Sequence, residues 1–560
     1  MKQVLFSTRF RTLIVLSLVA ATVFALSISK DFSSSAQKLD EGKNNPLSGT
    51  ITGTVYVDHN MNGVRETSGV APNLAIDAGI AGVTVTAYDG TGVARGSGVS
   101  GSNGAYTINA LGTGPYRLEF TTLPSGYQPS AVGTNNASTI KFVADGASAG
   151  NDLGIVLPGN YCQTNPFIAH NVYNIGPAAV DTIVRFPYNY SEELDGRLNS
   201  VDPTAWTTAP SRTSLLNSTG IIDADSVGAT FGITYDGRTS RLFSATYLKR
   251  GANFGTLSNE STGAIYVTNN PTGSPTTSTY VDLNAVFGAG TAGANPHPIS
   301  TTDFSTDNAS PTLVGKRGLG GLKLSANGAS LYTVNLNDRR LYVIPTSGAL
   351  NSTTITRFDI PTTGLVTSGG NCNAADVRPF AVGRDGSGQI YVGAVCSAES
   401  EANDTKVHAF VWRFTGSAFT LVANNTLTFA RNAGLANNAT WLRWDNTSTG
   451  VLFRSSPMLT DIEFDGNDMM LGFRDRYGDM TVLPDFNRGY GDLMRVCNVS
   501  GTFTFESNAT CGSSTSTDPG GNNNTGNGGR EFYTDLNGDG REEGGWGGLT
   551  QVPGSTTYWA

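Results

Sequence analysis

The sequence contains few charged residues and few histidines, and these shortages exclude several classes of protein. Charged side chains make up only 14% of the 560 residues, and Asp and Glu outnumber Lys and Arg by 45 to 36. Proteins that bind nucleic acids carry an excess of positive charge that neutralises phosphates, so we expect no nucleic-acid partner. Glycine has no three-residue period, which excludes a collagen-like chain.

The residues that are abundant favour an all-β protein. Glycine occurs 69 times, and aromatic residues at 9% are too many for a disordered chain. Thr, Val and Tyr are frequent between Gly-rich turns, and this composition is typical of many short strands. At ~100–200 residues per domain, the length predicts two or three domains.

Residues 1–29 have the pattern of a secretory signal peptide. Three basic residues precede an almost wholly apolar run from Leu13 to Ile28, and small residues suited to a cleavage site follow. The alternative is an uncleaved membrane anchor, but the run is short for the ~20 residues that a bilayer span needs. We therefore predict a secreted or cell-surface protein with no membrane span after cleavage, and a polar linker over residues 30–47.

The five cysteines agree with export. Cys497 and Cys511 flank a strand-like stretch, and Cys372 and Cys396 form a second candidate pair, which leaves Cys162 over. Zinc binding is the alternative, but the sequence has no C-x-x-C spacing and only four histidines. We therefore predict disulfides between the members of the two pairs.

A strand-like segment after the linker runs into a loop with the spacing of a calcium site. Oxygen ligands at positions 1, 3 and 5, a glycine at position 6 (Gly63) and a backbone carbonyl at position 7 allow a loop to surround a hard cation. The oxygens in this loop would come from Asp58, Asn60, Asn62, Val64 and Glu66. A plain Asn/Gly turn is the alternative. Two Asn in place of Asp predict a weaker affinity than that of an all-carboxylate loop.

Residues 48–158 as a whole resemble the SdrD B-like repeat of bacterial surface proteins. The motifs that carry the resemblance are Gly79–Val83 (GIAGV), Asn103–Tyr106 (NGAY) and Tyr116–Phe120 (YRLEF). The resemblance implies an Ig-like β-sandwich that calcium stabilises. It also implies a last acidic ligand at Asp77, which an insertion at about residues 67–76 separates from the loop. A stiffened stalk module is the role that such a domain implies.

The remaining residues, 159–560, contain a recurring pattern of two apolar strands joined by an Asp-Gly or Asn-Gly turn, a strong signal for a β-hairpin. The glycines of the four turns are Gly237, Gly328, Gly386 and Gly466. A further strand follows each hairpin. Strand sets repeated over ~400 residues predict an irregular β-propeller of six or seven blades. Residues 319–345, 458–479 and 547–555 also resemble segments of a propeller-like region found beside SdrD B-like modules in large bacterial cell-surface proteins. A row of tandem β-sandwiches is the alternative.

A Gly/Asn-rich insertion at about residues 513–530 precedes a second candidate calcium loop. Its spacing matches the ligand pattern of a calcium loop up to position 9. Its members would be Asp535, Asn537, Asp539, Arg541 and Glu543. Position 12 is Trp546, so the closing carboxylate would have to come from elsewhere. A solvated polar turn is the alternative.

The sequence contains no catalytic motif in a suitable context. It has no nucleophile elbow, metalloprotease helix, phosphate-binding loop or dinucleotide fingerprint. Two triplets, Asp338–Arg340 and Arg474–Arg476, would either line a propeller channel or form structural ion pairs, and ion pairs are the simpler interpretation.

Together these patterns predict a secreted or cell-surface structural or adhesion protein. A calcium-stabilised sandwich would carry a propeller that binds a surface, matrix or host protein or glycan. The alternative is an extracellular propeller hydrolase or lyase that acts on polysaccharide or peptide.

Overall fold

The computed structural model describes the chain from residue 49 onward, with gaps. The described residues are 49–58, 63–65, 77, 79–110, 114–130, 138–144, 148–158, 166–172, 181–187, 219–237, 239–297, 307–326, 328–386, 388–431, 440–446, 455–465, 467–480, 491–516, 526–533, 547–551 and 558–559. They confirm the all-β fold, because their helices are limited to short turns: α3 (Ala224–Val227), α4 (Leu283–Phe287) and α5 (Arg476–Met480). None of these described helices is long and apolar enough to cross a membrane. The predicted signal peptide and linker lie outside the described residues.

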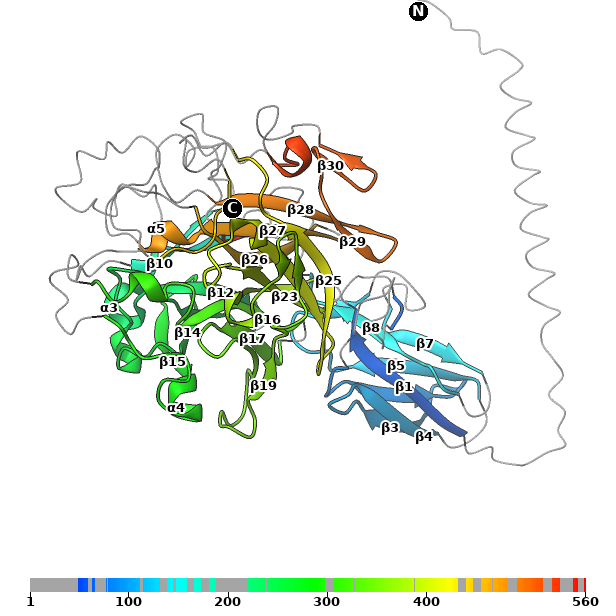
Figure 1. Ribbon diagram of the computed structural model, residues 1–560. Coiled ribbons are helices and arrows are strands. Elements are labelled where there is room, and N and C mark those ends of the chain that lie inside the picture. Colours follow the sequence, from blue (N-terminus) through cyan, green and yellow to red (C-terminus); the bar gives the residue numbers. More distant parts are fainter. Residues whose placement is uncertain are drawn as a thin grey trace, which may run out of the picture.

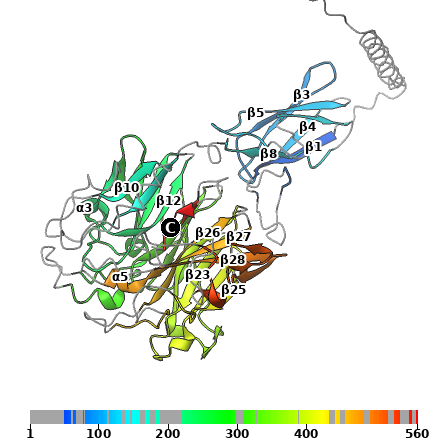
Figure 2. The same ribbon diagram turned by 90° about the horizontal axis from the view of Figure 1, so that it is seen from above.

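The N-terminal part is an Ig-like sandwich of two four-stranded sheets, which form a body of their own in Figures 1 and 2. The first sheet has the order β4 (Ala105–Ala110), β1 (Gly49–Val57), β8 (Leu153–Val156), β6 (Gln128–Pro129). The second has the order β3 (Ala94–Val99), β2 (Thr84–Tyr88), β5 (Tyr116–Thr121), β7 (Ile140–Val143). Alternate residues of each inner face meet in one apolar core, which includes Val55, Val85, Tyr106, Leu118 and Phe120.

Two glycines of the sandwich stand where no side chain fits. A Cβ on Gly79 would lie 1.9 Å from the carbonyl oxygen of Asn103. Gly104 has a φ of 77°, and a Cβ there would lie 2.1 Å from the carbonyl oxygen of Val55. The segment before β2 and the turn before β4 therefore pack backbone to backbone, which explains why both sequence motifs contain glycine at these positions.

The C-terminal part is built from consecutive antiparallel sheets, coloured from green to orange in Figure 1. The first four-stranded sheet contains β12 (Thr230–Asp236), β13 (Arg241–Thr246), β14 (Ala264–Asn269) and β15 (Thr276–Asp282). The second contains β16 (Leu319–Leu324), β17 (Ser330–Asn335), β18 (Arg340–Pro345) and β19 (Thr356–Asp359). The third contains β22 (Val377–Arg384), β23 (Ile390–Cys396), β24 (His408–Phe414) and β25 (Phe419–Thr426). The fourth contains β26 (Pro457–Asp465), β27 (Asp468–Asp475), β28 (Asp492–Val499) and β29 (Thr502–Phe505).

Smaller sheets complete the described part of this region. A three-stranded sheet contains β9 (Phe167–Asn171), β10 (Asp181–Pro187) and β11 (Thr219–Asp223). Three two-stranded sheets contain β20 (Val366–Thr367) with β21 (Gly370–Asn371), β30 (Thr510–Cys511) with β31 (Ser514–Thr515), and β32 (Thr550–Gln551) with β33 (Tyr558–Trp559).

The four predicted hairpins are confirmed, and each forms the first two strands of a four-stranded sheet. The described residues hold four such sheets and one three-stranded sheet, rather than six or seven blades. The wide spacing between hairpins has a different cause. Residues 283–318 and 427–456 connect successive sheets, and their described parts contribute no further four-stranded sheet.

The first strands of the four sheets lie side by side, with β12 next to β16, β16 next to β22 and β22 next to β26. Their backbones approach closely, since a Cβ on Gly232 would lie 2.6 Å from the carbonyl oxygen of Gly320. Gly383 pairs with Ile462 in parallel orientation, which merges the last two sheets into one eight-stranded sheet. The first strands of the four sheets are therefore in close backbone contact, each with the next.

Candidate functional site

The first calcium loop begins where β1 ends. Asp58 follows Val57, and its side chain is buried, with 1% exposure. Its Oδ2 accepts hydrogen bonds from the backbone N–H of Gly63 at 2.8 Å and from the hydroxyl of Ser130 at 2.5 Å. Gly63 has a φ of 71°, which favours glycine. The loop thus turns sharply at its sixth position and folds back onto the carboxylate at its first.

Asp77 belongs to the segment that a short antiparallel bridge joins to β1. The backbone of Tyr56 forms an isolated antiparallel bridge with Gly79, so Asp58 and Asp77 each lie two residues along the chain from this bridge. Asp77 is 2% exposed. A buried carboxylate is costly unless hydrogen bonds or positive charge compensate it. Carboxylate oxygens are ligands of the kind that calcium takes, and calcium at this loop stays a prediction.

The structure describes only one of the other predicted ligands of this loop. The side chain of Val64 is 55% exposed, so a role as ligand would rest on its backbone carbonyl. Asn60, Asn62 and Glu66 lie outside the described residues, so their positions stay predictions. Within the described part of the chain, no group of three or more His, Cys, Asp or Glu side chains converges as a metal site would require.

The second candidate loop lies entirely outside the described residues. This holds for Asp535, Asn537, Asp539, Arg541 and Glu543. Calcium at this loop stays a prediction from ligand spacing alone.

Arg474, the first member of the triplet Arg474–Arg476, belongs to a buried network centred on Asp479 of α5. Arg474 Nε lies 2.6 Å from Asp479 Oδ2, and Lys249 Nζ lies 3.2 Å from Oδ1. The hydroxyl of Tyr247 donates to the same carboxylate at 2.7 Å. Burial alone would raise the pKa of Asp479, but the two cations outweigh burial and hold the pKa below its usual range. The carboxylate therefore stays charged and joins residues from distant parts of the chain.

The other two members of this triplet also have structural contacts. Burial raises the pKa of Asp475 to about 6, although the N–H of Ser456 donates to its carboxylate at 2.9 Å. The guanidinium of Arg476 stacks on Trp444 at 4.6 Å and donates to the carbonyl of Val314 at 2.9 Å. Both side chains are held within the protein, so neither is available to a ligand in this conformation.

The triplet Asp338–Arg340 makes local contacts of the same kind. Tyr342 donates its hydroxyl to Asp338 at 2.6 Å, and Arg340 Nε lies 2.6 Å from Asp359. Arg339 donates to the carbonyl of Ala374 at 2.5 Å. The structural interpretation therefore accounts for this triplet as well.

Sequence reasoning missed a charge cluster on the inner strands. Lys323 of β16 contacts the carboxylate of Glu463 and lies 3.3 Å from that of Asp461, both on β26. Burial would lower the pKa of Lys323, but the two carboxylates raise it above its usual value. The spacing Asp461-x-Glu463 in a strand was the available signal, because residues two apart share a face.

A second cluster that the sequence did not reveal contains Ser310, His297 and Asp307. Asp307 Oδ2 lies 2.9 Å from His297 Nδ1, and the hydroxyl of Ser310 lies 3.1 Å from the same nitrogen. In a catalytic triad the acid and the nucleophile contact opposite nitrogens of the imidazole. Here they share one nitrogen, so the cluster lacks the geometry for nucleophilic catalysis.

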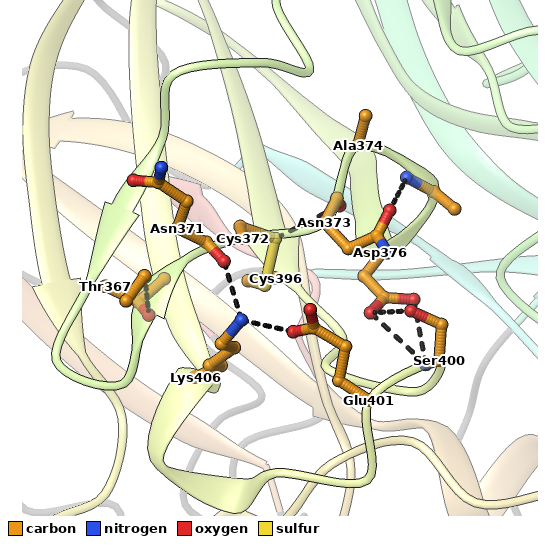
Figure 3. Close-up of a disulfide and its surroundings, with 12 residues drawn as sticks. Thr367, Asn371, Cys372, Asn373, Ala374, Asp376, Cys396, Ser400, Glu401 and Lys406 are labelled. Carbon is orange, nitrogen blue, oxygen red and sulfur yellow. Dashed lines mark hydrogen bonds and ion pairs between the residues drawn. A yellow bond between two sulfur atoms is a disulfide. The ribbon is translucent and has the colours of Figure 1, made fainter.

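Two disulfides are present, Cys372–Cys396 and Cys497–Cys511, the pairs that the spacing suggested. Figure 3 shows the first, which ties the segment after β21 to the end of β23. Lys406 lies beside it and contacts Glu401. Cys162 lies outside the described residues.

Comparisons with known proteins agree with the N-terminal fold. Residues 49–153 match the family model described as "SdrD B-like domain". A curated relative, serine-aspartate repeat-containing protein D of Staphylococcus aureus (strain Newman), is 35% identical over 113 residues, which cover 19% of this chain and 8% of that protein.

Similarity to the Colossins of Dictyostelium discoideum extends over most of the chain. Colossin-D is 25% identical over 486 residues, covering 83% of this chain and 47% of that protein. Colossin-B is 26% identical over 541 residues, covering 90% and 13%. The chain thus spans less than half the length of these relatives.

A solved structure, the exo-beta-1,3-galactanase 1,3Gal43A from Clostridium thermocellum, is 9% identical to this chain. The match covers 62% of this chain and 59% of that chain, with a TM-score of 0.30. So low a TM-score supports no assignment. The comparisons therefore show an SdrD B-like domain over residues 49–153 and similarity to the Colossins over most of the chain.

Proposed function

We propose that the protein is a secreted or cell-surface structural or adhesion protein. In this proposal the sandwich is a calcium-stabilised module, and the C-terminal sheets form a platform that binds a surface, matrix or host protein or glycan. Support comes from the match to an SdrD B-like domain and from similarity to the Colossins over 83% of the chain. The predicted signal peptide supports export.

The observation that carries the proposal is the buried pair Asp58 and Asp77. Bound calcium would neutralise both carboxylates and link the loop after β1 to the segment before β2. Because these segments are separate in the sequence, the crosslink would stiffen the sandwich against extension. Stiffness of this kind suits a stalk that holds a binding platform away from a surface.

Surface labelling of intact cells tests the proposed location. Cells of the source organism that produce the full chain with a C-terminal tag are treated with a membrane-impermeant biotin reagent. We expect the chain to be labelled, and mass spectrometry of its N-terminal peptide to show cleavage near residue 29. An unlabelled chain that retains residues 1–29 would contradict the proposal. Attachment of these cells to immobilised matrix, compared with cells lacking the chain, tests the adhesion role.

The alternative is an extracellular hydrolase or lyase, and among the described residues Asp461 and Glu463 are the feature that favours it. Both carboxylates contact Lys323, so a catalytic role would require that ion pair to open. Release of reducing ends from polysaccharides by the purified chain, lost in a Glu463→Gln variant, would support an enzyme. Equal release by the variant and the native chain would assign the activity to a contaminant.

A further inference from the structure

An open cavity of about 430 Å³ lies at the surface where the two end strands of the eight-stranded sheet meet. β25 and β29 are the first and last strands of that sheet, and they approach each other, as Figure 1 shows on the right of the C-terminal body. The lining residues are Val422, Ala423, Asn424 and Asn425 from β25, Phe503, Thr504 and Phe505 from β29, and Ser507 and Asn527 beyond it. The volume falls within the roughly 300–1,000 Å³ of ligand sites.

The lining is polar but carries no charge. It contains three carboxamides and two hydroxyls, together with two phenyl rings and two small aliphatic side chains. A charged ligand would lose hydration here without gaining a counter-charge. A wholly apolar ligand would leave the amides without partners. A neutral molecule that carries both hydroxyl groups and C–H faces satisfies both kinds of surface.

The carboxamides are held in fixed orientations. Asn424 Oδ1 accepts a hydrogen bond from His408 Nε2 at 3.0 Å, so its NH₂ group is the end left for a ligand. Asn425 Nδ2 donates to the carbonyl of Thr426 at 2.9 Å, which leaves its oxygen. Asn527 Nδ2 likewise donates to a backbone carbonyl and leaves its oxygen. In the described part of the chain these three remaining ends have no hydrogen-bond partner, so the cavity offers both donors and acceptors.

The titratable groups behind the lining keep it neutral. Burial lowers the pKa of His408, so the imidazole is uncharged at pH 7 and its Nε2–H can donate to Asn424. Burial raises the pKa of Glu506, which stands between two lining residues, to about 8. Near neutral pH both groups are therefore mainly uncharged, and neither attracts an ionic ligand.

We propose that this cavity binds a neutral saccharide, one or two sugar units in size, through Asn424, Asn425, Thr504 and Asn527. Sugars present hydroxyls that both donate and accept, and their C–H faces pack against apolar groups. A peptide strand inserted between β25 and β29 is disfavoured, because Cα atoms of the two strands approach within 8 Å. A strand paired on both sides requires roughly 9.6 Å. The inference rests on the proposed binding role of the C-terminal platform and names its ligand class.

Saturation-transfer NMR on the full chain tests the inference with glucose, galactose, mannose, N-acetylglucosamine and lactose as probes. We expect at least one of these neutral sugars to bind, and glucuronic acid and glucose phosphate to bind more weakly. Asn424→Ala and Thr504→Val should each weaken binding roughly fivefold, since each removes a hydrogen bond to the ligand. The matched control is Thr502→Val, an exposed threonine of the same strand outside the lining, which should leave binding unchanged.

Three results would overturn the inference. They are no signal from any neutral sugar, equal binding by the native chain and both lining variants, and binding of an uncharged pentapeptide instead of the sugars. If Asn424→Ala fails to fold, the binding measured for Thr504→Val decides between the outcomes. This substitution changes an exposed side chain and keeps its volume, so the variant should fold. If cells that produce the chain attach to matrix but the chain binds none of the sugars, the saccharide inference alone is overturned and the adhesion proposal stands.

Discussion

Removal of calcium from the pair Asp58 and Asp77 should destabilise the sandwich and leave the C-terminal sheets intact. Two carboxylates that bind one calcium ion lie roughly 5 Å apart, since each ligand oxygen is about 2.3–2.6 Å from the ion. At an effective dielectric constant of about 20, two unit charges at that separation repel by roughly 3 kcal/mol. For a domain of this size, 1 kcal/mol shifts the melting temperature by roughly 4–8 °C. Chelation should therefore lower the melting temperature of the sandwich by roughly 10–25 °C.

The distribution of tryptophan allows both parts of the full chain to be followed together. All six tryptophans lie beyond residue 158, so their fluorescence reports on the C-terminal region, whereas calorimetry detects both transitions. EDTA should lower the temperature of the calorimetric transition that belongs to the sandwich. The temperature of the transition seen by tryptophan fluorescence should not change. Asp58→Ala should abolish that response to EDTA, and Asp89→Ala, which removes an acid from a hairpin turn of the same sandwich, should retain it. An unchanged calorimetric profile after chelation would refute the calcium site.

Three further perturbations test the C-terminal region. Asp479→Asn should lower the free energy of unfolding by roughly 3–5 kcal/mol, because the buried Arg474 loses its counter-charge; a loss below about 1 kcal/mol in guanidinium titrations would contradict the buried network. Glu506 has a pKa raised by burial from 4.5 to about 8, so its contribution to stability is present in acid and is lost as the pH rises through 8. Glu506→Gln should therefore match the native chain near pH 4 and exceed it at pH 8 by as much as about 4 kcal/mol, and equal denaturation midpoints at pH 8 would refute this. Replacement of Cys372 and Cys396 by Ala should lower the free energy of unfolding by about 3 kcal/mol, and the melting temperature of the double variant should respond less to dithiothreitol than that of the native chain.

The sequence predicted those parts of the fold that local signals determine. An Asp-Gly or Asn-Gly turn between alternating strands specifies a hairpin without reference to the rest of the chain, and all four hairpins are present. The described residues contain fewer four-stranded sheets than predicted, because a long insertion and a missed blade have the same effect on the spacing of hairpins. The close approach of Gly232 to Gly320 was also hidden, because it joins strands about 90 residues apart in sequence.

The same distinction applies to the candidate sites. Asp58 and Gly63 belong to one loop, so the ligand spacing alone indicated their proximity, and the resemblance supplied Asp77. The ion pair of Lys323 with Glu463 joins residues 140 positions apart, and no local pattern reports it. The cavity between β25 and β29 escaped sequence reasoning for this reason too, since it forms only when two distant sheet edges meet.

The network around Asp479 has a consequence for the order of folding. Tyr247 and Lys249 follow the second strand of the first four-stranded sheet, and Asp479 follows the second strand of the fourth, 232 residues after Tyr247. Contacts at such sequence separation carry a large loop-closure entropy and tend to form late. Each sheet is a local meander that can form before its neighbours are complete. The contacts of the Asp479 carboxylate therefore form only after the intervening sheets have assembled. Loss of these contacts should accelerate unfolding far more than it slows folding.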